Sequence, residues 1–371
     1  MKPNLLFILH VSPPVNGAAM VGDYISKSPI INRTYDIDYI NLTTSFTLDK
    51  IGKGGIGKIQ GTFKIQSKVL RALLSNRYEL CYMTLTARGA GFYKDFFVVL
   101  LLKLFGKKII YHFHNKGVQE NSKKWYNHLL YRITFHNTQS ILLAPTLYKD
   151  IERYVEKDKV HFCPNGIPDL MGKTLVKIEK TKKAEICQFL FLSNMMEEKG
   201  VFELLKACKI LKAKKTAFQC HFIGAWSDIS ERSFMDLVDQ YDLTNNILVH
   251  GKKYDAEKIQ FFKNADIFIL PTFYHNECFP LVLLEAMQHA LPIISTKEGA
   301  ISEMVVDGVT GVVITQKNTQ ELADRMEMLM NDPDLREKMG AAGRKRYEKL
   351  FTLTVFENKL KSILTDAIDK V

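Results

Sequence analysis

The chain has 371 residues, 46% of them hydrophobic and 25% charged, which predicts a globular protein large enough for two domains and excludes a disordered chain. Its longest apolar run, from Phe96 to Leu102, is too short to cross a bilayer, which excludes a membrane-spanning protein. The six cysteines lack metal-binding spacing, which indicates a reducing compartment, so we expect a cytoplasmic protein.

The surplus positive charge is confined to the first half of the chain. Residues 1–170 contain 23 Lys and Arg against 12 Asp and Glu, whereas residues 171–371 contain 28 of each class. A net charge of +11 in the first half predicts an anionic partner, which could be a membrane surface, a phosphorylated substrate or a nucleic acid. A solvated basic face without a partner is the alternative.

The first half is predicted to alternate strands with helices, which is typical of a parallel α/β sheet. Gly17 lies in the loop after the first strand, where a ligand could approach the start of a helix. His114 comes at the carboxyl end of a later strand, where open α/β sheets bind ligands, although a structural histidine is the alternative. Strands are expected at 5–9, 37–40, 80–84, 108–113, 140–144 and 159–162.

Residues 49–77 form a basic segment, with seven Lys and Arg, one acid and interleaved apolar residues. Such a segment predicts contact with an anionic membrane surface, and packing on its own domain is the alternative. Residues 52–57 match the dinucleotide fingerprint G-x-G-x-x-G, but no strand precedes them and no acid follows at the required distance. We therefore predict a flexible loop there, which argues against an NAD-dependent oxidoreductase.

The second half repeats the alternation after a linker predicted at 171–185, which is rich in Lys, Glu and Thr. Lys199 and Gly200 lie between a strand and a helix that runs from Val201 to about Ala213, an arrangement suited to binding phosphate. Strands are expected at 188–192, 221–223, 247–249, 267–270 and 291–295.

Two carboxylates, Glu277 and Glu285, flank a nearly unbroken apolar run. Pro280 suits the first turn of a helix, and the residues from Leu281 to Met287 are apolar except for Glu285. A buried carboxylate is costly unless it is partnered, so Glu285 is either functional or a satisfied core glutamate.

The stretch from Glu277 to Met287 resembles the E-x7-E signature of retaining glycosyltransferases of GT-B architecture, in the large family four of sugar-nucleotide-dependent enzymes. Further motifs occur in the order of that family, before and after this stretch: residues 13–17, His114, 164–166, Lys199-Gly200, Gly251, 291–294, 298–303 and 307–311. The resemblance implies two Rossmann-like domains whose parallel sheets face each other across a cleft. The N-terminal domain would be 1–170 plus a C-terminal helix at about 352–371 that crosses back, and the nucleotide-sugar domain would be 171–351.

The resemblance also implies roles for individual residues. Glu285 would accept hydrogen bonds from the ribose hydroxyls, Glu277 would contact the donor sugar, and Lys199 would neutralise the diphosphate. His114 would contact the sugar from the other domain, and the segment around Gly251 would lie near the base. The remaining positions expected to bind the donor are Gly17, Asn194, Phe279, Pro280, Leu281 and Val282. Because fixed cations and helix dipoles can stabilise the leaving group, no metal or other cofactor is expected.

The sequence departs from the family pattern at two places. Many members carry an arginine where this chain has Asn194, so Arg88 or Lys116 of the first domain could supply the missing charge or contact the acceptor. Cys278 also replaces the glycine that is usual after the first glutamate. Both changes raise the prospect of an unusual donor.

The implied activity is retaining transfer of a hexosyl or N-acetylhexosaminyl group from a nucleotide-sugar, with UDP favoured over GDP. The expected acceptor is a saccharide or a lipid-diphosphate-linked saccharide of bacterial surface polysaccharides, such as O-antigen, capsule or exopolysaccharide. The first half would associate with the anionic inner face of the cytoplasmic membrane, and nucleic acid is not expected, because no recognised motif is present. The alternative is a catalytically silent or epimerase-type protein of the same architecture that binds a nucleotide-sugar.

Overall fold

The structure is a computed structural model that describes residues 2–13, 16–43, 56–170 and 186–369. It divides into two compact units, unit 1 (Met1–Gly166 with Leu353–Val371) and unit 2 (Ile167–Thr352). The expected linker at 171–185 and residues 49–55 of the basic segment, including the first four of the glycine fingerprint, lie outside the described residues. Each unit is described separately below.

Unit 1 is built on a sheet of six parallel strands in the order β2-β1-β3-β4-β5-β6. The central strands consist almost entirely of buried residues, as expected for a parallel sheet that is covered on both faces. The strands are β1 (Asn4–Leu9), β2 (Asp36–Asn41), β3 (Leu80–Thr84), β4 (Ile109–His112), β5 (Gln139–Leu142) and β6 (Val160–Phe162). The predicted α/β alternation is confirmed, although β4 ends one residue earlier than expected.

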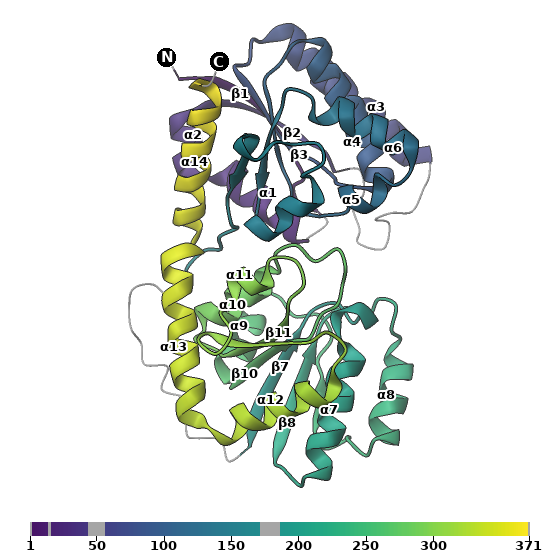
Figure 1. The fold of residues 1–371 in the computed structure, drawn as a ribbon, viewed down its shortest axis with the longest axis vertical. Helices are drawn as coiled ribbons and strands as arrows, with labels where there is room; N and C mark the ends of the chain where they lie inside the picture. Colours follow the sequence, from purple (N-terminus) through teal and green to yellow (C-terminus); the bar gives the residue numbers. More distant parts are fainter. Residues whose placement is uncertain (1, 14–15, 44–55, 171–185, 370–371) are drawn as a thin grey trace. The chain divides into compact units, whose positions relative to one another are not determined.

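The helices of unit 1 form two layers because the chain reverses its direction across the sheet after β2. Right-handed crossovers place helices on opposite faces before and after such a reversal. One layer contains α1 (Gly17–Lys27), α2 (Pro29–Thr34) and α14 (Leu353–Asp369), and the other contains α3 (Ile56–Ser75), α4 (Gly89–Leu104), α5 (Val118–Asn121) and α6 (Trp125–Phe135). Figure 1 shows α3, α4 and α6 side by side.

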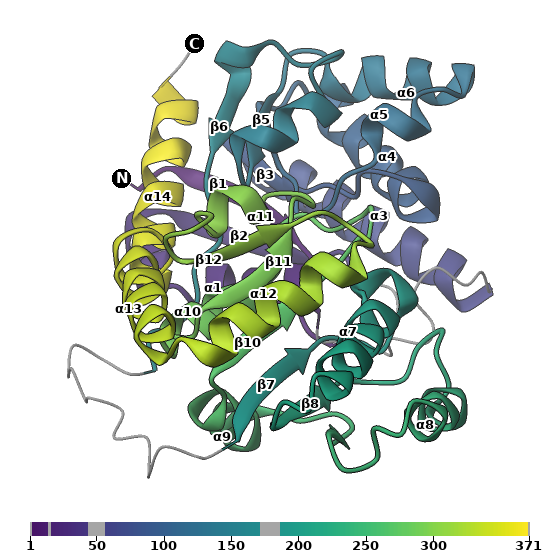
Figure 2. The same ribbon diagram turned by 60° about the horizontal axis from the view of Figure 1, so that its bottom comes forward.

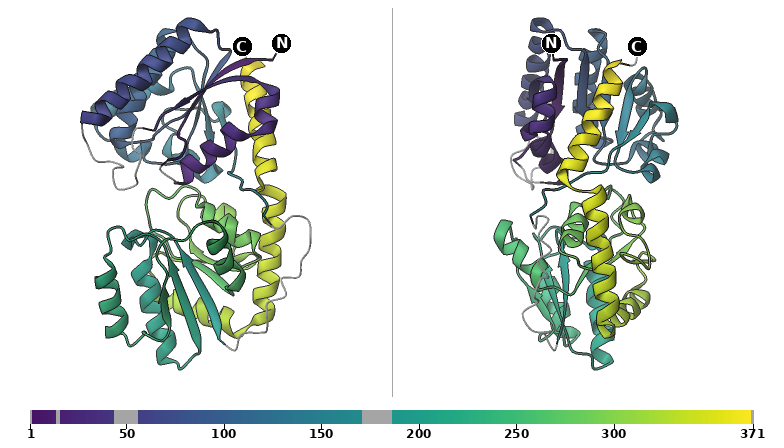
Figure 3. Two further views of the ribbon diagram at one scale, coloured as in Figure 1. Left: turned by 180° about the vertical axis from the view of Figure 1, so that it is seen from behind. Right: turned by 90° about the vertical axis from the view of Figure 1, so that its left-hand side faces the viewer.

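The last helix, α14, belongs to unit 1 although it is far away in the sequence. It packs against α2, as Figure 3 also shows, and the hydroxyl of Tyr35 donates a hydrogen bond of 2.8 Å to the carbonyl oxygen of Lys361. The apolar face of α14 is buried, including Phe356, Leu360 and Leu364. The expectation that the C-terminal helix returns to the first half of the chain is confirmed.

Unit 2 has a second sheet of six parallel strands, in the order β12-β11-β10-β7-β8-β9. Its strands are β7 (Cys187–Leu192), β8 (Phe218–Ile223), β9 (Ile247–Val249), β10 (Ile267–Leu270), β11 (Ile293–Thr296) and β12 (Gly311–Ile314). Figure 2 shows α12 beside α7, and α13 packs against α10. Besides a short 3-10 helix, η4 (Glu197–Lys199), the helices are α7 (Val201–Ala213), α8 (Glu231–Gln240), α9 (Asp255–Asn264), α10 (Leu281–Gln288), α11 (Ile301–Met304), α12 (Thr319–Asn331) and α13 (Pro333–Leu350).

The loops that follow the parallel strands collect at one edge of each sheet, and that edge carries the predicted site residues of each unit. Among the described residues, no helix combines the length and apolarity needed to cross a membrane.

Candidate functional site

The loop that carries Lys199 is fixed against the segment after β10. Gly200, the N-cap residue of α7, has a φ of +81°, and a Cβ atom there would come within 2.3 Å of the carbonyl oxygen of Pro271. The backbone N–H of Phe273 donates a hydrogen bond of 2.8 Å to the carbonyl oxygen of Glu198. Only glycine permits this close approach, so backbone geometry requires the glycine of the Lys-Gly pair noted in the sequence.

Lys199 and Glu277 form an ion pair in which the lysine Nζ contacts the carboxylate Oε2. The side chains are only 14% and 10% exposed, respectively, and the lysine Nζ also lies 4.7 Å from the ring centroid of Tyr274. The low local dielectric strengthens the attraction, while partial burial makes either charge costly without the other. The structure therefore brings together two of the three residues predicted to be catalytic.

Gly299 supports the loop that carries Glu277. It has a φ of +56°, and a Cβ atom there would come within 2.3 Å of the carbonyl oxygen of Glu277. The next residue, Ala300, donates its backbone N–H to the carbonyl oxygen of Cys278 at 2.8 Å. In the sequence, this segment was noted only because its motif occurs in the order of the family. In the structure, it packs directly against the backbone of Glu277 and Cys278.

Glu285 lies in the second turn of α10, as predicted, and has a charged partner. Its Oε1 atom is 2.6 Å from the Nζ atom of Lys258 on α9, and the side chains are 17% and 24% exposed, respectively. The sequence analysis missed Lys258, because nothing in the local pattern links two residues 27 positions apart. The carboxylate of Glu285, whose burial was inferred to be costly, is therefore paired with the ammonium group of Lys258.

The first turn of α10 differs slightly from the expectation. The helix begins at Leu281, and Pro280 is its N-cap residue with an extended ψ of 107°. Phe279 is buried, with its ring centroid 5.9 Å from that of Phe351, whereas Leu281 and Val282 are partly exposed. The N-terminus of a helix presents backbone N–H groups and a partial positive charge, so this turn is suited to an anionic group.

Asn194 and Gly251 follow β7 and β9 at the same edge of the sheet. Asn194 is exposed, and the loop is held by a 2.7 Å hydrogen bond from the N–H of Met195 to Ala225. Gly251 has a φ of +63°, and its carbonyl oxygen accepts a hydrogen bond of 2.9 Å from Gly224. Both backbones are thus anchored, and the Asn194 side chain remains accessible.

The ring of His250 stacks on that of His221, with 5.1 Å between the centroids and 2.9 Å between Nε2 and Nδ1. The second nitrogen of His221 contacts the amide oxygen of Gln188 at 2.7 Å. Burial, and then the neighbouring His250, lower the pKa of His221 to about 4. This uncharged histidine pair lies beside Gly251, where the base of a nucleotide is expected.

In unit 1, His114 lies two residues beyond the end of β4, and its ring packs 4.2 Å from that of His112. Within the described part of the chain, both ring nitrogens of His114 are buried without a hydrogen-bond partner. Burial, and then the field of His10, lower its pKa to about 3. His114 is therefore a neutral imidazole with unused hydrogen-bonding capacity at the carboxyl edge of the sheet.

His10, which follows β1, also lies at this edge and was not picked from the sequence. Its Nδ1 atom is 3.1 Å from the hydroxyl of Thr84. Burial and the nearby Lys94 lower its pKa to about 4. Lys94 itself lies 3.3 Å from the fully buried carboxylate of Asp95. The position of His10 directly after the first strand was the signal that could have identified it.

The remaining predicted residues of unit 1 are Gly17, Arg88 and Lys116. Gly17 is the exposed first residue of α1. The guanidinium of Arg88 lies 3.3 Å from the carboxylate of Glu120, and its side chain covers Gly117. Lys116 is partly exposed in the loop after β4. Arg88 is thus already engaged with a carboxylate within unit 1.

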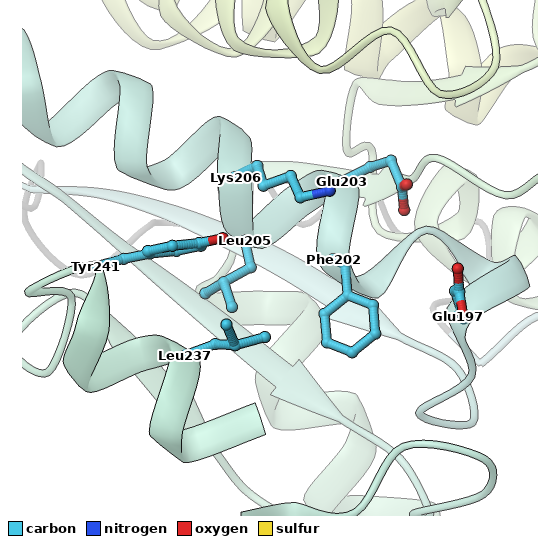
Figure 4. Close-up of a pocket in the computed structure, with 7 residues that line it drawn as sticks. All are labelled: Glu197, Phe202, Glu203, Leu205, Lys206, Leu237 and Tyr241. Atoms are coloured by element: carbon cyan, nitrogen blue, oxygen red, sulfur yellow. The ribbon is translucent and has the colours of Figure 1, made fainter. Parts of the chain in front are cut away.

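A pocket of about 270 Å³ lies between α7 and α8, as shown in Figure 4. It is lined by Glu197, Phe202, Glu203, Leu205, Lys206, Leu237 and Tyr241, and it contains none of the predicted site residues. Over the described ranges, no three His, Cys, Asp or Glu side chains are placed to hold a metal ion.

Comparisons with known proteins find similarity to glycosyltransferases. Residues 175–346 match the family glycosyl transferases group 1. The capsular polysaccharide biosynthesis glycosyltransferase CapM of Staphylococcus aureus is 31% identical over 173 residues, which are 47% of this chain and 44% of the relative. The chain thus spans less than half the length of this curated relative.

Two solved structures share the fold over the whole chain. A glycosyltransferase from Rickettsia africae ESF-5 has a TM-score of 0.75, with 18% identity and full coverage of both chains. HepE from Anabaena, solved in complex with UDP, has a TM-score of 0.73, with 15% identity over 99% of this chain and 100% of that one. The α/β fold with two parallel sheets is that of GT-B glycosyltransferases. Residues 175–346 of this chain, which contain both glutamates and both lysine partners, match the family model of the glycosyl transferases group 1.

Proposed function

We propose that this chain is a retaining glycosyltransferase that moves a sugar from a nucleotide-sugar, with UDP as the favoured nucleotide, to a saccharide or a lipid-diphosphate-linked saccharide. The contact between Lys199 and Glu277 beside the N-terminus of α10 carries the proposal. It brings a cation, a carboxylate and a helix N-terminus together at one sheet edge. The names of relatives, which include capsular polysaccharide biosynthesis, support a role in bacterial surface polysaccharides.

Lys199 is the residue that stabilises the leaving diphosphate in this proposal. Glu277 and the ring of Tyr274 hold its ammonium group in place before the donor binds, so little reorganisation is needed. The N–H groups of Leu281 and Val282 at the start of α10 add a second source of positive potential. This arrangement supports catalysis without a metal ion.

Glu285 would bind the ribose hydroxyls, and the ion pair with Lys258 orients its carboxylate. An ionised carboxylate only accepts hydrogen bonds, which suits a pair of hydroxyl donors. The backbone around Gly251 and the exposed Asn194 would border the base and the diphosphate. The UDP bound in the HepE structure supports UDP as the first nucleotide to test.

In the proposed reaction, an acceptor hydroxyl attacks the anomeric carbon from the face that the diphosphate leaves. The new glycosidic bond forms as the bond between the anomeric carbon and the phosphate oxygen breaks. The departing phosphate oxygen takes the proton of the hydroxyl, and a nucleoside diphosphate is released. Glu277 positions the sugar, and the neutral His114 donates or accepts a hydrogen bond with one of its hydroxyls.

The first test is thermal stabilisation of the protein by UDP, GDP, their sugars and NAD. A ligand at 100 times its dissociation constant adds about 2.7 kcal/mol to the free energy of unfolding. We expect stabilisation by UDP and a UDP-sugar, loss of that effect in Glu285→Ala, and its retention in Glu337→Ala, which changes an exposed glutamate on α13.

The products then separate the alternatives. Transfer to an acceptor with an unchanged anomeric configuration supports the proposal, and an inverted product refutes retention. Release of an epimerised sugar without transfer indicates an epimerase. Stabilisation by a nucleotide-sugar without transfer or epimerisation indicates a silent homologue, and absence of stabilisation by every nucleotide refutes nucleotide-sugar binding.

A further inference from the structure

One side of unit 1 carries a row of apolar side chains that are exposed among the described residues of the unit. Six side chains on α3, α4 and α6 are between 51% and 80% exposed, and we call them the three-helix face: Phe63, Leu74, Phe97, Leu104, Trp125 and Leu129. They are set four, seven or eleven residues apart within each helix, so each helix presents them along a single stripe. Exposed patches of this kind mark interaction surfaces.

The three helices form one continuous layer. α4 packs against both α3 and α6, which places it between them (Figure 1). Side-chain bonds link α4 to α6: the hydroxyl of Tyr93 donates to the amide oxygen of Asn127 at 2.9 Å, and Lys103 donates to the carbonyl oxygen of His136 at 2.5 Å. The three stripes therefore belong to one rigid surface.

The charge of this layer is almost entirely positive. The sequences of α3, α4 and α6 contain seven Lys and Arg and one acid, Asp95, which is fully buried. Lys64, Lys68 and Arg71 are exposed along α3, and Lys123 and Lys124 are exposed just before Trp125. Like charges oppose pairing of this face with a second copy of itself, whereas an anionic surface would complement it.

We propose that the three-helix face docks on an anionic lipid bilayer, with Trp125, Leu129 and Leu104 at the level of the headgroups. Tryptophan favours the membrane–water interface, and basic residues next to it are attracted to anionic lipids. The basic segment noted in the sequence supplies only α3, and the surface is completed by α4 and α6. This inference stands on the exposed residues of unit 1 and does not depend on sugar transfer.

The tryptophan content of the chain allows a direct test. The sequence has two tryptophans, and Trp226 of unit 2 donates to the carboxylate of Glu231 at 3.1 Å. In Trp226→Phe, the fluorescence therefore reports Trp125 alone, and in Trp125→Phe it reports Trp226 alone. With vesicles of equal parts phosphatidylglycerol and phosphatidylcholine, we expect a blue shift and protection from acrylamide in Trp226→Phe only. Unchanged emission of Trp125 on vesicle-bound protein would overturn the proposal.

Charge variants test the same surface by vesicle sedimentation. Each basic residue near an anionic surface contributes about fivefold to binding, so Lys64→Gln, Lys68→Gln and Arg71→Gln together should weaken binding by about a hundredfold. Lys338→Gln, Lys345→Gln and Lys349→Gln remove the same charge from exposed positions on α13 and should change binding far less. Equal losses in both triple variants would show attraction by net charge without a defined face, and would refute the proposal.

Apolar variants complete the test. Leu129→Glu should reduce vesicle binding at raised salt, where charge attraction is screened, and Val309→Glu in unit 2 should not. Sedimentation without lipid shows whether the protein forms a dimer. Protection of Trp125 from acrylamide in such a dimer would assign the three-helix face to a second copy of the chain and would contradict docking on a bilayer. Stabilisation by UDP in the same preparation keeps any failure of docking separate from failure of the proposed transfer.

Discussion

The predicted catalytic residues of the two units differ in whether they carry a charge. In unit 2, Lys199 and Glu277 are both charged and neutralise each other. In unit 1, His114 is itself kept neutral, and neither of its ring nitrogens has a partner within the described ranges. The same parallel architecture thus presents an ionic edge in one unit and an uncharged hydrogen-bonding edge in the other. Chemistry is set by the loops and not by the fold.

The two sheet edges therefore suit different chemical groups. A diphosphate needs cations and helix N-termini, which unit 2 offers, whereas a sugar needs hydrogen bonds without net charge, which His114 can make. Part of the positive surplus of unit 1 lies on α3, α4 and α6, which contain seven Lys and Arg and one acid. Variants that remove one member of each arrangement test this difference.

Removal of the Lys199 charge is expected to have the largest effect. Loss of one group that stabilises transition-state charge typically lowers the rate by about 10²–10³-fold. Lys199→Ala should therefore reduce kcat/KM for the nucleotide-sugar by that amount, as measured by initial rates of nucleotide release. Lys206→Ala, an exposed lysine on α7, is the control. Similar rates in the two variants would remove Lys199 from the mechanism.

The backbone behind Glu277 should be the next most sensitive feature. Gly299→Ala combines a positive φ with the collision against the Glu277 carbonyl and should cost about 3 kcal/mol of unfolding free energy. Gly308 also has a positive φ, +70°, but no atom lies within 4 Å of a Cβ placed there, so Gly308→Ala should cost about 1 kcal/mol. Urea unfolding measures the loss of unfolding free energy in both variants. Equal losses would show that the positive φ alone determines the cost and that the collision with the Glu277 carbonyl does not contribute.

The two glutamates should separate in their kinetics. Glu285→Gln weakens ribose binding and should raise KM for the donor by about tenfold, with little change in kcat. Glu277→Gln disturbs the positioned sugar and Lys199, so it should mainly lower kcat. Steady-state kinetics with varied donor distinguishes these outcomes. A fall in donor affinity as complete as the fall in turnover for Glu277→Gln would reduce its role to binding.

The neutral edge of unit 1 predicts a small pH effect. The folded pKa of His114, about 3, lies below the unfolded value of 6.5, so the unfolded chain binds more protons between these values. Stability is therefore lost as the pH falls through 6.5, by about 0.7 kcal/mol for one histidine between pH 7 and pH 6. His114→Gln should show a correspondingly smaller decrease in unfolding free energy, and His136→Gln, an exposed histidine, should behave like the parent.

Much of the fold could be predicted because apolar runs bounded by turns mark buried parallel strands. The segments Ile247–Val249 and Ile267–Leu270 are strands with the predicted limits. Their side chains are mostly buried, so local composition and tertiary environment agree. At β4 the strand was expected to reach Phe113, but it ends at His112. The backbone N–H of Phe113 still donates a hydrogen bond of 3.0 Å to the carbonyl oxygen of Ile141, so the pairing with β5 continues one residue beyond the strand.

The candidate site was less accessible from the sequence. Lys199 and Glu277 could be picked because each lies in a recognisable local pattern. Lys258 could not, because its relation to Glu285 exists only when α9 and α10 pack. The three-helix face could be predicted only in part, because the exposure of Trp125 and Leu104 depends on which sides of α6 and α4 contact the sheet. Tertiary packing supplies this information.

The return of α14 to unit 1 has a consequence for biosynthesis. The residues of unit 1 before Gly166 are made first, yet they lack the helix that covers their apolar surface with Phe356, Leu360 and Leu364. Unit 2 is continuous in sequence and can fold as soon as it leaves the ribosome. The unit whose synthesis starts first therefore finishes folding last, and a nascent chain stalled before Leu353 would expose apolar surface to chaperones and proteases.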